Sequence, residues 1–146
     1  MYLDTGILVK LLTPEPESSF FEHELLGHAL VSSELALVEV KSALFAKERA
    51  GLITAAQRAK AEAKFAAMVS DGIFKLASLN NHTLRKAMQI IQACQPKVPL
   101  RALDALHVAA CDLSQEFPLG TTDARMHAAA RTMHIPVFPE KLPVTI

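Results

Sequence analysis

The chain has 146 residues, of which 15 are Lys or Arg and 15 are Asp or Glu, so its formal net charge at pH 7 is zero. Hydrophobic residues make up 51% of the sequence and charged residues 21%, which is typical of one globular domain over residues 1–146 with a single core. These values exclude a disordered chain, a collagen-like repeat and a polybasic arm that binds nucleic acid.

The first half of the chain predicts short strands that alternate with helices. Apolar runs, Ser and Thr caps and helix-ending glycines indicate the boundaries. In chain order we expect a strand ending near Asp4, a helix that stops before Pro14, a helix capped by Ser18 or Ser19 and ended by Gly27, a strand over residues 29–31, a helix opened by Ser32-Ser33 and closed by Gly51, and a helix from Thr54 to about Ser70.

The second half continues this alternation. We expect a strand over residues 74–77, a helix capped by Asn80-Asn81 and reaching Cys94, a helix over 100–114, a strand over 118–122, a helix over 123–133 and a strand over 136–138. Strands that are separated by helices pair in parallel, and the helices then cover both faces of the sheet. The sequence therefore predicts an α/β fold, a three-layer sandwich with a central parallel sheet of four to five strands flanked by helices.

The cysteines and the apolar stretches bear on the cellular location. Cys94 and Cys111 cannot form a disulfide framework and lack the spacing of metal ligands, so we expect reduced thiols and a cytoplasmic protein. No apolar stretch approaches the roughly 20 residues that span a bilayer, and we expect no membrane partner. We expect His107 to pack beside Asp104, or to donate a hydrogen bond to it, rather than to bind zinc.

Two acidic residues stand at the ends of predicted strands. Asp4 closes the first strand, and Asp123 follows Gly120-Thr121-Thr122 at a strand-to-helix turn. Ligands of parallel sheets bind beyond the carboxyl ends of the strands, so both side chains lie where chemistry is expected. The alternative for each residue is a helix N-cap, whose carboxylate accepts hydrogen bonds from backbone N–H groups.

Two further acids lie on apolar helix faces. Glu39 has small or apolar neighbours three and four residues away, and Asp104 interrupts a helix that is otherwise nearly all apolar. Burying an unpaired carboxylate is costly, so each needs a partner. The structural alternatives are a buried salt bridge of Glu39 with Lys10 or Lys41, and an intrahelical pair of Asp104 with Arg101.

Together, the four acids predict a site for divalent cations. Crowded carboxylates repel one another, and their pKa values rise unless cations neutralise them. Oxygen ligands suit Mg²⁺ or Mn²⁺, which can activate a water molecule and stabilise the charge of a phosphoryl transition state. The residues alone therefore predict a metal-dependent phosphoryl or phosphodiester hydrolase.

Four segments resemble the PIN-domain family, in particular the VapC type of toxin from prokaryotic toxin–antitoxin pairs. They are residues 2–11 (YLDTGILVKL), 32–44 (SSELALVEVKSAL), 100–110 (LRALDALHVAA) and 121–125 (TTDAR). Their order and spacing extend through nearly the whole chain, and four motifs in order are more specific than any one of them.

The resemblance implies a five-stranded parallel sheet and an endoribonuclease that uses Mg²⁺ or Mn²⁺, with Asp4, Glu39, Asp104 and Asp123 as its acidic cluster. It also implies a homodimer and a cognate antitoxin whose C-terminal segment covers the site. We expect the three aspartates to hold one or two ions, with Glu39 as a ligand or a water-positioning group. A water molecule that the metal activates then attacks an RNA phosphodiester in line, leaving a 5′-phosphate and a 3′-hydroxyl.

Other positions match the family less directly. Thr5 and Thr121 match hydroxyl positions near the site, and we expect them to orient a carboxylate or a metal-bound water. Arg125 matches a frequent basic position that could contact a phosphate. Gly6 departs from the family, which usually has Ser or Asn there, and this removes a potential hydrogen bond near Asp4.

Basic residues are expected to border the acids. They are Lys10, Lys41, Arg101 and Arg125, of which the last three are the candidate RNA contacts. A positive rim around a metal-loaded acidic site makes a net charge of zero compatible with an RNA substrate. The alternative function is a non-catalytic PIN-like interaction module.

Overall fold

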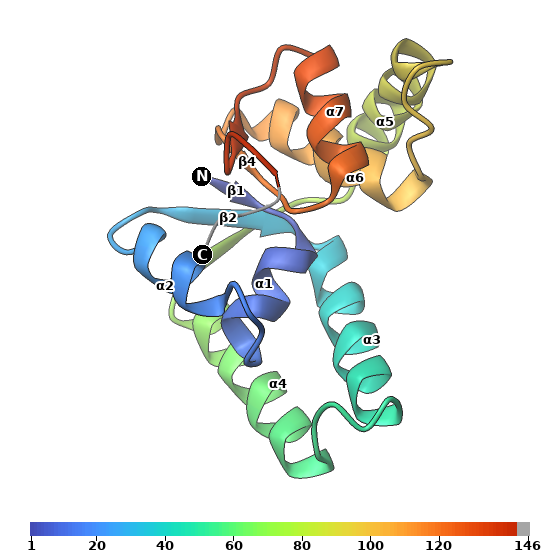
Figure 1. Ribbon diagram of the computed structural model, residues 1–146. Helices are drawn as coiled ribbons and strands as arrows, with labels where there is room; N and C mark the ends of the chain where they lie inside the picture. Colours follow the sequence, from blue (N-terminus) through green and yellow to red (C-terminus); the bar gives the residue numbers. More distant parts are fainter. Residues whose placement is uncertain (143–146) are drawn as a thin grey trace.

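Figure 1 shows the computed structural model, a parallel sheet with helices on both of its faces. The structure describes residues 1–142. Its strands form one five-stranded sheet in the order β3-β2-β1-β4-β5. They are β1 (Tyr2–Leu3), β2 (Leu30–Ser33), β3 (Phe74–Ala77), β4 (Leu119–Gly120) and β5 (Val137–Phe138). Every pairing is parallel, which confirms the predicted three-layer α/β sandwich.

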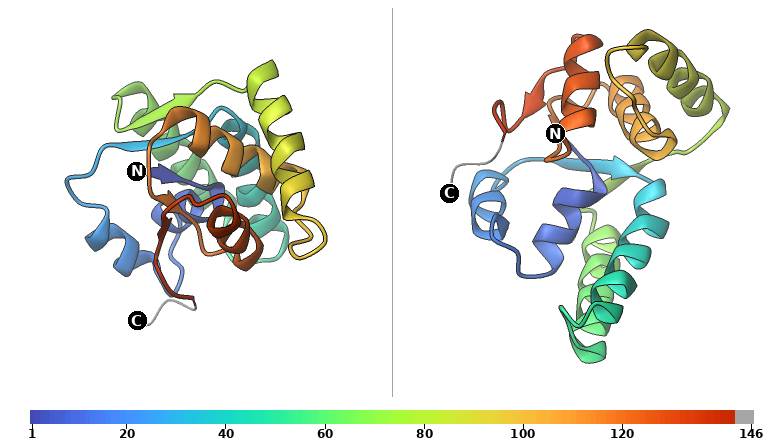
Figure 2. Two further views of the ribbon diagram at one scale, coloured as in Figure 1. Left: turned by 90° about the horizontal axis from the view of Figure 1, so that it is seen from above. Right: turned by 45° about the vertical axis from the view of Figure 1, so that its right-hand side comes forward.

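The helices divide into two groups, one on each face of the sheet (Figures 1 and 2). One face is covered by α1 (Thr5–Leu12), α2 (Ser18–Glu24), α3 (Leu35–Arg49) and α4 (Ala55–Ser70). The other face is covered by α5 (Asn81–Cys94), α6 (Ala102–Ser114) and α7 (Ala124–Thr132). Within residues 1–142, the helices are too short or too polar to cross a membrane.

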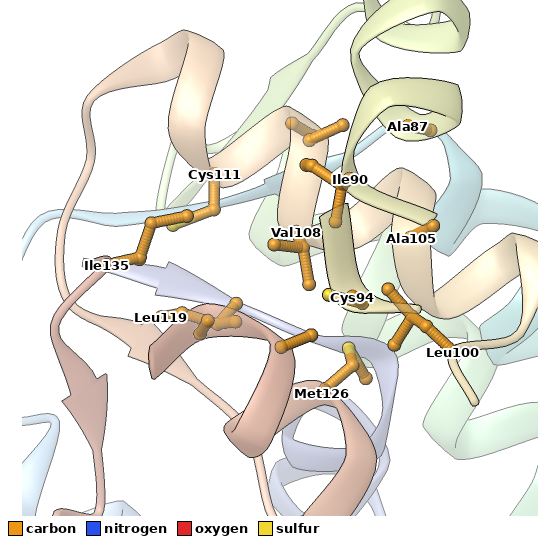
Figure 3. Close-up of a cluster of buried hydrophobic side chains, with 14 of the residues drawn as sticks. Ala87, Ile90, Cys94, Leu100, Ala105, Val108, Cys111, Leu119, Met126 and Ile135 are labelled. Atoms are coloured by element: carbon orange, nitrogen blue, oxygen red, sulfur yellow. The ribbon is translucent and has the colours of Figure 1, made fainter. Parts of the chain in front are cut away.

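Successive side chains of the central strands belong to two separate apolar cores, one on each face of the sheet. Tyr2 and Val31 belong to the core beneath α5, α6 and α7, whereas Leu3 and Leu30 belong to the core beneath α1 to α4. Successive residues of a strand point to opposite faces, so a strand that is covered on both sides is apolar at adjacent positions. Figure 3 shows the first of these cores, in which Val108 of α6 lies among side chains of the neighbouring helices.

Capping residues begin several helices where the sequence predicted them. The Thr54 hydroxyl accepts a hydrogen bond from the Gln57 N–H (3.1 Å), and the Gln57 side chain accepts one from the Thr54 N–H (2.8 Å). This reciprocal capping box starts α4. The Asn80 side chain likewise accepts from the Thr83 N–H at the start of α5. Gly51 follows α3 with a φ of +71°, a conformation that favours glycine.

Two predicted helix starts were wrong: Ser18 and Ser32 bond to other segments, whereas the Ser33 hydroxyl accepts a hydrogen bond at the start of α3, from the first N–H of that helix (3.1 Å). The Ser18 hydroxyl does not cap α2; it accepts a hydrogen bond from the Glu15 N–H (2.9 Å) and donates to a backbone carbonyl of α1 (2.6 Å). Ser32 and Ser33 belong to β2 rather than to α3. The Ser32 hydroxyl donates to the Leu3 carbonyl (2.8 Å), which ties β2 to β1.

The ends of β1 and β4 form the topological switch point of the sheet. After β1 the chain enters α1 on one face, and after β4 it enters α7 on the opposite face (Figure 1). Because these two connections diverge, they leave the carboxyl ends of the two strands uncovered. Asp4 directly follows β1, and residues 121–123 directly follow β4, so both segments meet at this edge.

Gly120→Ala is expected to destabilise the fold. The added Cβ atom would lie 2.7 Å from Leu3 Cδ2 and 3.1 Å from the Tyr2 carbonyl oxygen. Overpacking of this kind costs about 1–3 kcal/mol of unfolding free energy, which denaturant titration measures. Leu3→Val removes the clashing atom. It should therefore lower the unfolding free energy less in the Gly120→Ala variant than in the wild type. Equal unfolding free energies for the wild type and Gly120→Ala would contradict this account of the β1–β4 contact.

Candidate active site

The four acids singled out by the sequence line one hollow at the switch point. Asp4, Glu39, Asp104 and Asp123 surround a space of about 370 Å³. The other residues that line it are Thr5, Gly6, His107, Thr122 and Met126. Four different elements supply the acids, which precede α1, lie in α3 and α6, and precede α7. The fold therefore brings together carboxylates that are far apart in the sequence.

Asp4 is almost fully buried, with 2% of its surface exposed, and both of its carboxylate oxygens are held. Oδ1 accepts a hydrogen bond from the Ile7 N–H (2.8 Å), and Oδ2 accepts one from the Thr121 hydroxyl (2.6 Å). Burial raises the pKa of Asp4, and these two hydrogen bonds offset only part of that rise. Asp4 is thus a rigidly oriented carboxylate that a nearby positive charge would stabilise.

Asp123 caps α7 with a single oxygen. Its Oδ1 atom accepts hydrogen bonds from the Arg125 and Met126 N–H groups (2.8 and 2.9 Å), so Oδ2 remains available to the hollow. The Thr121 hydroxyl also accepts a hydrogen bond from the Asp123 N–H (3.0 Å). Thr121 therefore links Asp4 to the backbone at Asp123. The N-cap alternative is correct for both aspartates, and it does not remove either of them from the hollow.

Glu39 lies between α1 and α6. Its Oε2 atom accepts a hydrogen bond from the Thr5 hydroxyl (2.6 Å) and lies 2.5 Å from His107 Nε2. Burial alone would raise the pKa of Glu39, but the interaction with His107 and the hydrogen bond from Thr5 lower it overall. The alternative salt bridges were wrong: Lys10 pairs with glutamates beyond α1, and Lys41 pairs with a glutamate of α4.

Asp104 differs from the other three acids because it has an oxygen that is both buried and without a hydrogen-bond partner in residues 1–142. Within the described residues, Oδ2 is buried and makes no hydrogen bond. Burial and the nearby charge of Asp123 raise the pKa of Asp104, and the charge of Arg101 opposes this rise. The alternative intrahelical salt bridge with Arg101 is not formed among the described residues. An unpaired buried oxygen that faces three other carboxylates is suited to a cation.

His107 lines the same hollow as Asp104, but the described residues form no hydrogen bond between the two. Its polar contacts are instead to other elements: its Nδ1 atom lies 2.8 Å from the Tyr2 hydroxyl, and its Nε2 atom contacts Glu39. The residue is 2% exposed. A fully buried histidine in an apolar helix needs polar partners on other elements. This requirement could have predicted that His107 contacts residues outside α6. Sequence reasoning also missed Thr122 and Met126 as lining residues.

The basic residues are less concentrated around the hollow than expected. Arg101 is exposed at the start of α6 and Arg125 is half-buried in the first turn of α7, each within three residues of an acid of the hollow. Lys41 lies two residues after Glu39, so it points away from it, and it contacts Glu62 (3.0 Å). Lys10 lines a different hollow of about 580 Å³, at the far end of α1. The expectation that Lys10 and Lys41 border the acids was wrong.

The donor set fits a hard divalent cation that keeps part of its water shell. Among residues 1–142, no three His, Cys, Asp or Glu side chains converge closely enough to ligate one ion by themselves. Mg²⁺ is commonly held by one or two carboxylates and several waters, so a ready three-ligand centre is not required. The unpartnered Asp104 oxygen and the open Asp123 oxygen supply oxygen ligands of this kind. The identity of the direct ligands stays a prediction.

Two of the solved structures that share this fold are from Neisseria gonorrhoeae and Klebsiella pneumoniae. The crystal structure of FitAcB from Neisseria gonorrhoeae has a TM-score of 0.66 and 16% identity, over 94% of this chain and 95% of that chain. A toxin–antitoxin complex from Klebsiella pneumoniae has a TM-score of 0.65 and 17% identity, over 99% of this chain and 98% of that chain. At these identities the likeness shows the fold alone, and no curated protein matches the sequence.

The sequence itself matches a family model. The model described as "PIN domain" aligns with residues 1–132, a range that contains every acid of the hollow. It also contains the switch point between β1 and β4 and both apolar cores except for β5 and the residues beside it. The chain belongs to the PIN domain family.

Proposed function

We propose that the protein is a metal-dependent endoribonuclease that hydrolyses RNA phosphodiester bonds. The observation that carries this proposal is the unpartnered Asp104 oxygen beside three other carboxylates. A carboxylate with a purely structural role would be paired, since an unsatisfied buried group costs about 1–3 kcal/mol. A cation-binding role would explain why the protein keeps this unsatisfied oxygen. A bound Mg²⁺ or Mn²⁺ would supply an activated water and neutralise charge on the phosphate.

The chain's own residues would share the work as follows. Asp104 and Asp123 offer open oxygens for the cation, and Asp4 adds negative charge from a fixed position. Glu39 keeps Oε2 on its two donors, so Oε1 is the atom that would accept a hydrogen bond from the attacking water. Arg101 and Arg125 stand near enough in the chain to contact the RNA phosphates. In-line attack would then leave a 5′-phosphate and a 3′-hydroxyl.

We further propose that the protein is the toxin of a toxin–antitoxin pair and acts as a homodimer in the cytoplasm. Support for an antitoxin comes from the Klebsiella pneumoniae structure, which is itself a toxin–antitoxin complex of the same fold. Support for a second copy comes from large apolar side chains that stay exposed. On α3 and α5 they include Leu37, Val38, Leu84 and Met88, which are 48%, 70%, 47% and 69% exposed.

Cleavage of RNA by Asp104→Asn tests the catalytic proposal. The variant keeps the shape of the side chain and removes its charge, so we expect a loss of roughly 100-fold or more in cleavage rate with Mg²⁺ or Mn²⁺. Asp112→Asn is the matched control, because Asp112 is on the same helix but pairs with Lys86 (2.6 Å). Wild-type activity in Asp104→Asn, or full wild-type activity in EDTA, would favour the non-catalytic interaction module instead.

The same variant should be more stable than the wild type when metal is absent. Because the pKa of Asp104 is raised in the fold, this carboxyl contributes stability at low pH that is lost as the pH rises through the raised pKa. The side chain introduced by Asp104→Asn does not ionise, so the variant's Tm at pH 7 in EDTA should exceed that of the wild type.

The pH dependence separates this effect from other changes in stability. The difference in Tm between Asp104→Asn and the wild type should shrink toward pH 4, near the ordinary pKa of 3.8. Adding Mn²⁺ at pH 7 should raise the Tm of the wild type more than that of the variant. A variant that is less stable than the wild type at pH 7, or a difference that is independent of pH, would contradict the assignment of Asp104 as an unpaired acid.

A further inference from the structure

A chain of buried hydrogen bonds runs behind the acidic hollow. Tyr2 of β1 contacts His107 Nδ1 through its hydroxyl (2.8 Å), and His107 Nε2 contacts Glu39 Oε2 (2.5 Å). The Thr5 hydroxyl donates to the same Glu39 oxygen (2.6 Å) and lies 3.3 Å from Nε2. Tyr2 is fully buried and His107 is 2% exposed, so this chain is closed to solvent on the side away from the hollow.

The donors and acceptors of this hydrogen-bond chain can be ordered from Tyr2 to Glu39. The Tyr2 hydroxyl lies 2.8 Å from His107 Nδ1 and has a hydrogen that it can donate to it. When Nδ1 accepts, the hydrogen of a neutral imidazole is on Nε2. The Nε2–H group then points at Glu39, which can only accept. Each polar atom from Tyr2 to Glu39 is satisfied in this arrangement, in which the tyrosine fixes the tautomer of the histidine.

These hydrogen bonds fix the orientation of the Glu39 side chain. Its side chain is 21% exposed and projects from α3 toward three aspartates that repel it. Two donors on Oε2, His107 and Thr5, hold the carboxylate against that repulsion, and neither of them engages Oε1. A glutamate with three side-chain torsions would otherwise populate several rotamers, including ones that point to solvent.

We propose that His107 is a positioning residue of this site, which holds Glu39 in its working orientation through Nε2–H while Tyr2 sets the tautomer. As regards cleavage, this inference rests on the proposed ribonuclease function. Groups that orient an acid beside a metal typically change affinity or activity by 10–100-fold when they are replaced. His107 lines the hollow, but in this role it acts through Glu39.

Two substitutions at this one position separate positioning from packing. The amide nitrogen of His107→Gln takes roughly the place of Nε2, so it can still donate to Glu39 but loses Tyr2. The amide of His107→Asn takes roughly the place of Nδ1, so it keeps Tyr2 but loses Glu39. Each variant therefore gives up one buried hydrogen bond, and the two should have similar Tm values.

Their kinetics should differ if the proposal is correct. With Mn²⁺ and an RNA substrate, we expect His107→Asn to lose 10–100-fold in kcat with little change in KM, and His107→Gln to stay within about threefold of the wild type. Equal losses of kcat in the two variants, or losses that follow their Tm values, would show that His107 only fills space and would overturn the proposal.

A second readout does not depend on RNA or metal. Ring ¹⁵N spectra of the metal-free wild type should show the His107 signals, identified by their absence from His107→Gln, in the Nε2–H tautomer. An Nδ1–H tautomer would overturn the proposal even if cleavage is normal. A wild type that shows the Nε2–H tautomer but cleaves no RNA would contradict the ribonuclease function and leave the positioning of Glu39 supported.

Discussion

The repulsion among four carboxylates at the switch point is the constraint on which the site depends. Parallel order places the residues after β1 and β4 side by side, and α3 and α6 add one acid each to the same hollow. Hydrogen-bond donors offset this repulsion. They are backbone N–H groups at two helix starts, two threonine hydroxyls and one histidine. Within residues 1–142, Asp104 is the acid of the hollow that keeps a buried oxygen with no such donor.

This distribution separates fixed acids from an open one. Asp4 and Glu39 are oriented by two donors each, so their geometry is set before any cation arrives. Under the proposed function, Asp104 would gain its compensation from a cation in the hollow, so stability and function would oppose each other at this residue. The repulsion among the carboxylates would then be the same interaction that attracts a cation.

Local signals predicted much of the fold, and they were wrong where side chains serve distant partners. Thr54 and Asn80 cap helices through neighbours three residues away, so the sequence was sufficient there. Ser32 looks like a cap in sequence but bonds to Leu3, and no local pattern reveals that contact. The same limit applies to the site. Its four acids were identified by their position, whereas the contact between Glu39 and His107 joins residues 68 apart.

The central claim is that this acidic hollow takes up a divalent cation, and calorimetric titration with Mn²⁺ tests it most directly. The wild type should bind Mn²⁺ with saturable heat, Asp104→Asn should bind it at least tenfold more weakly, and Asp112→Asn should match the wild type. Indistinguishable binding by the wild type and Asp104→Asn, or no saturable binding by the wild type, would contradict the account.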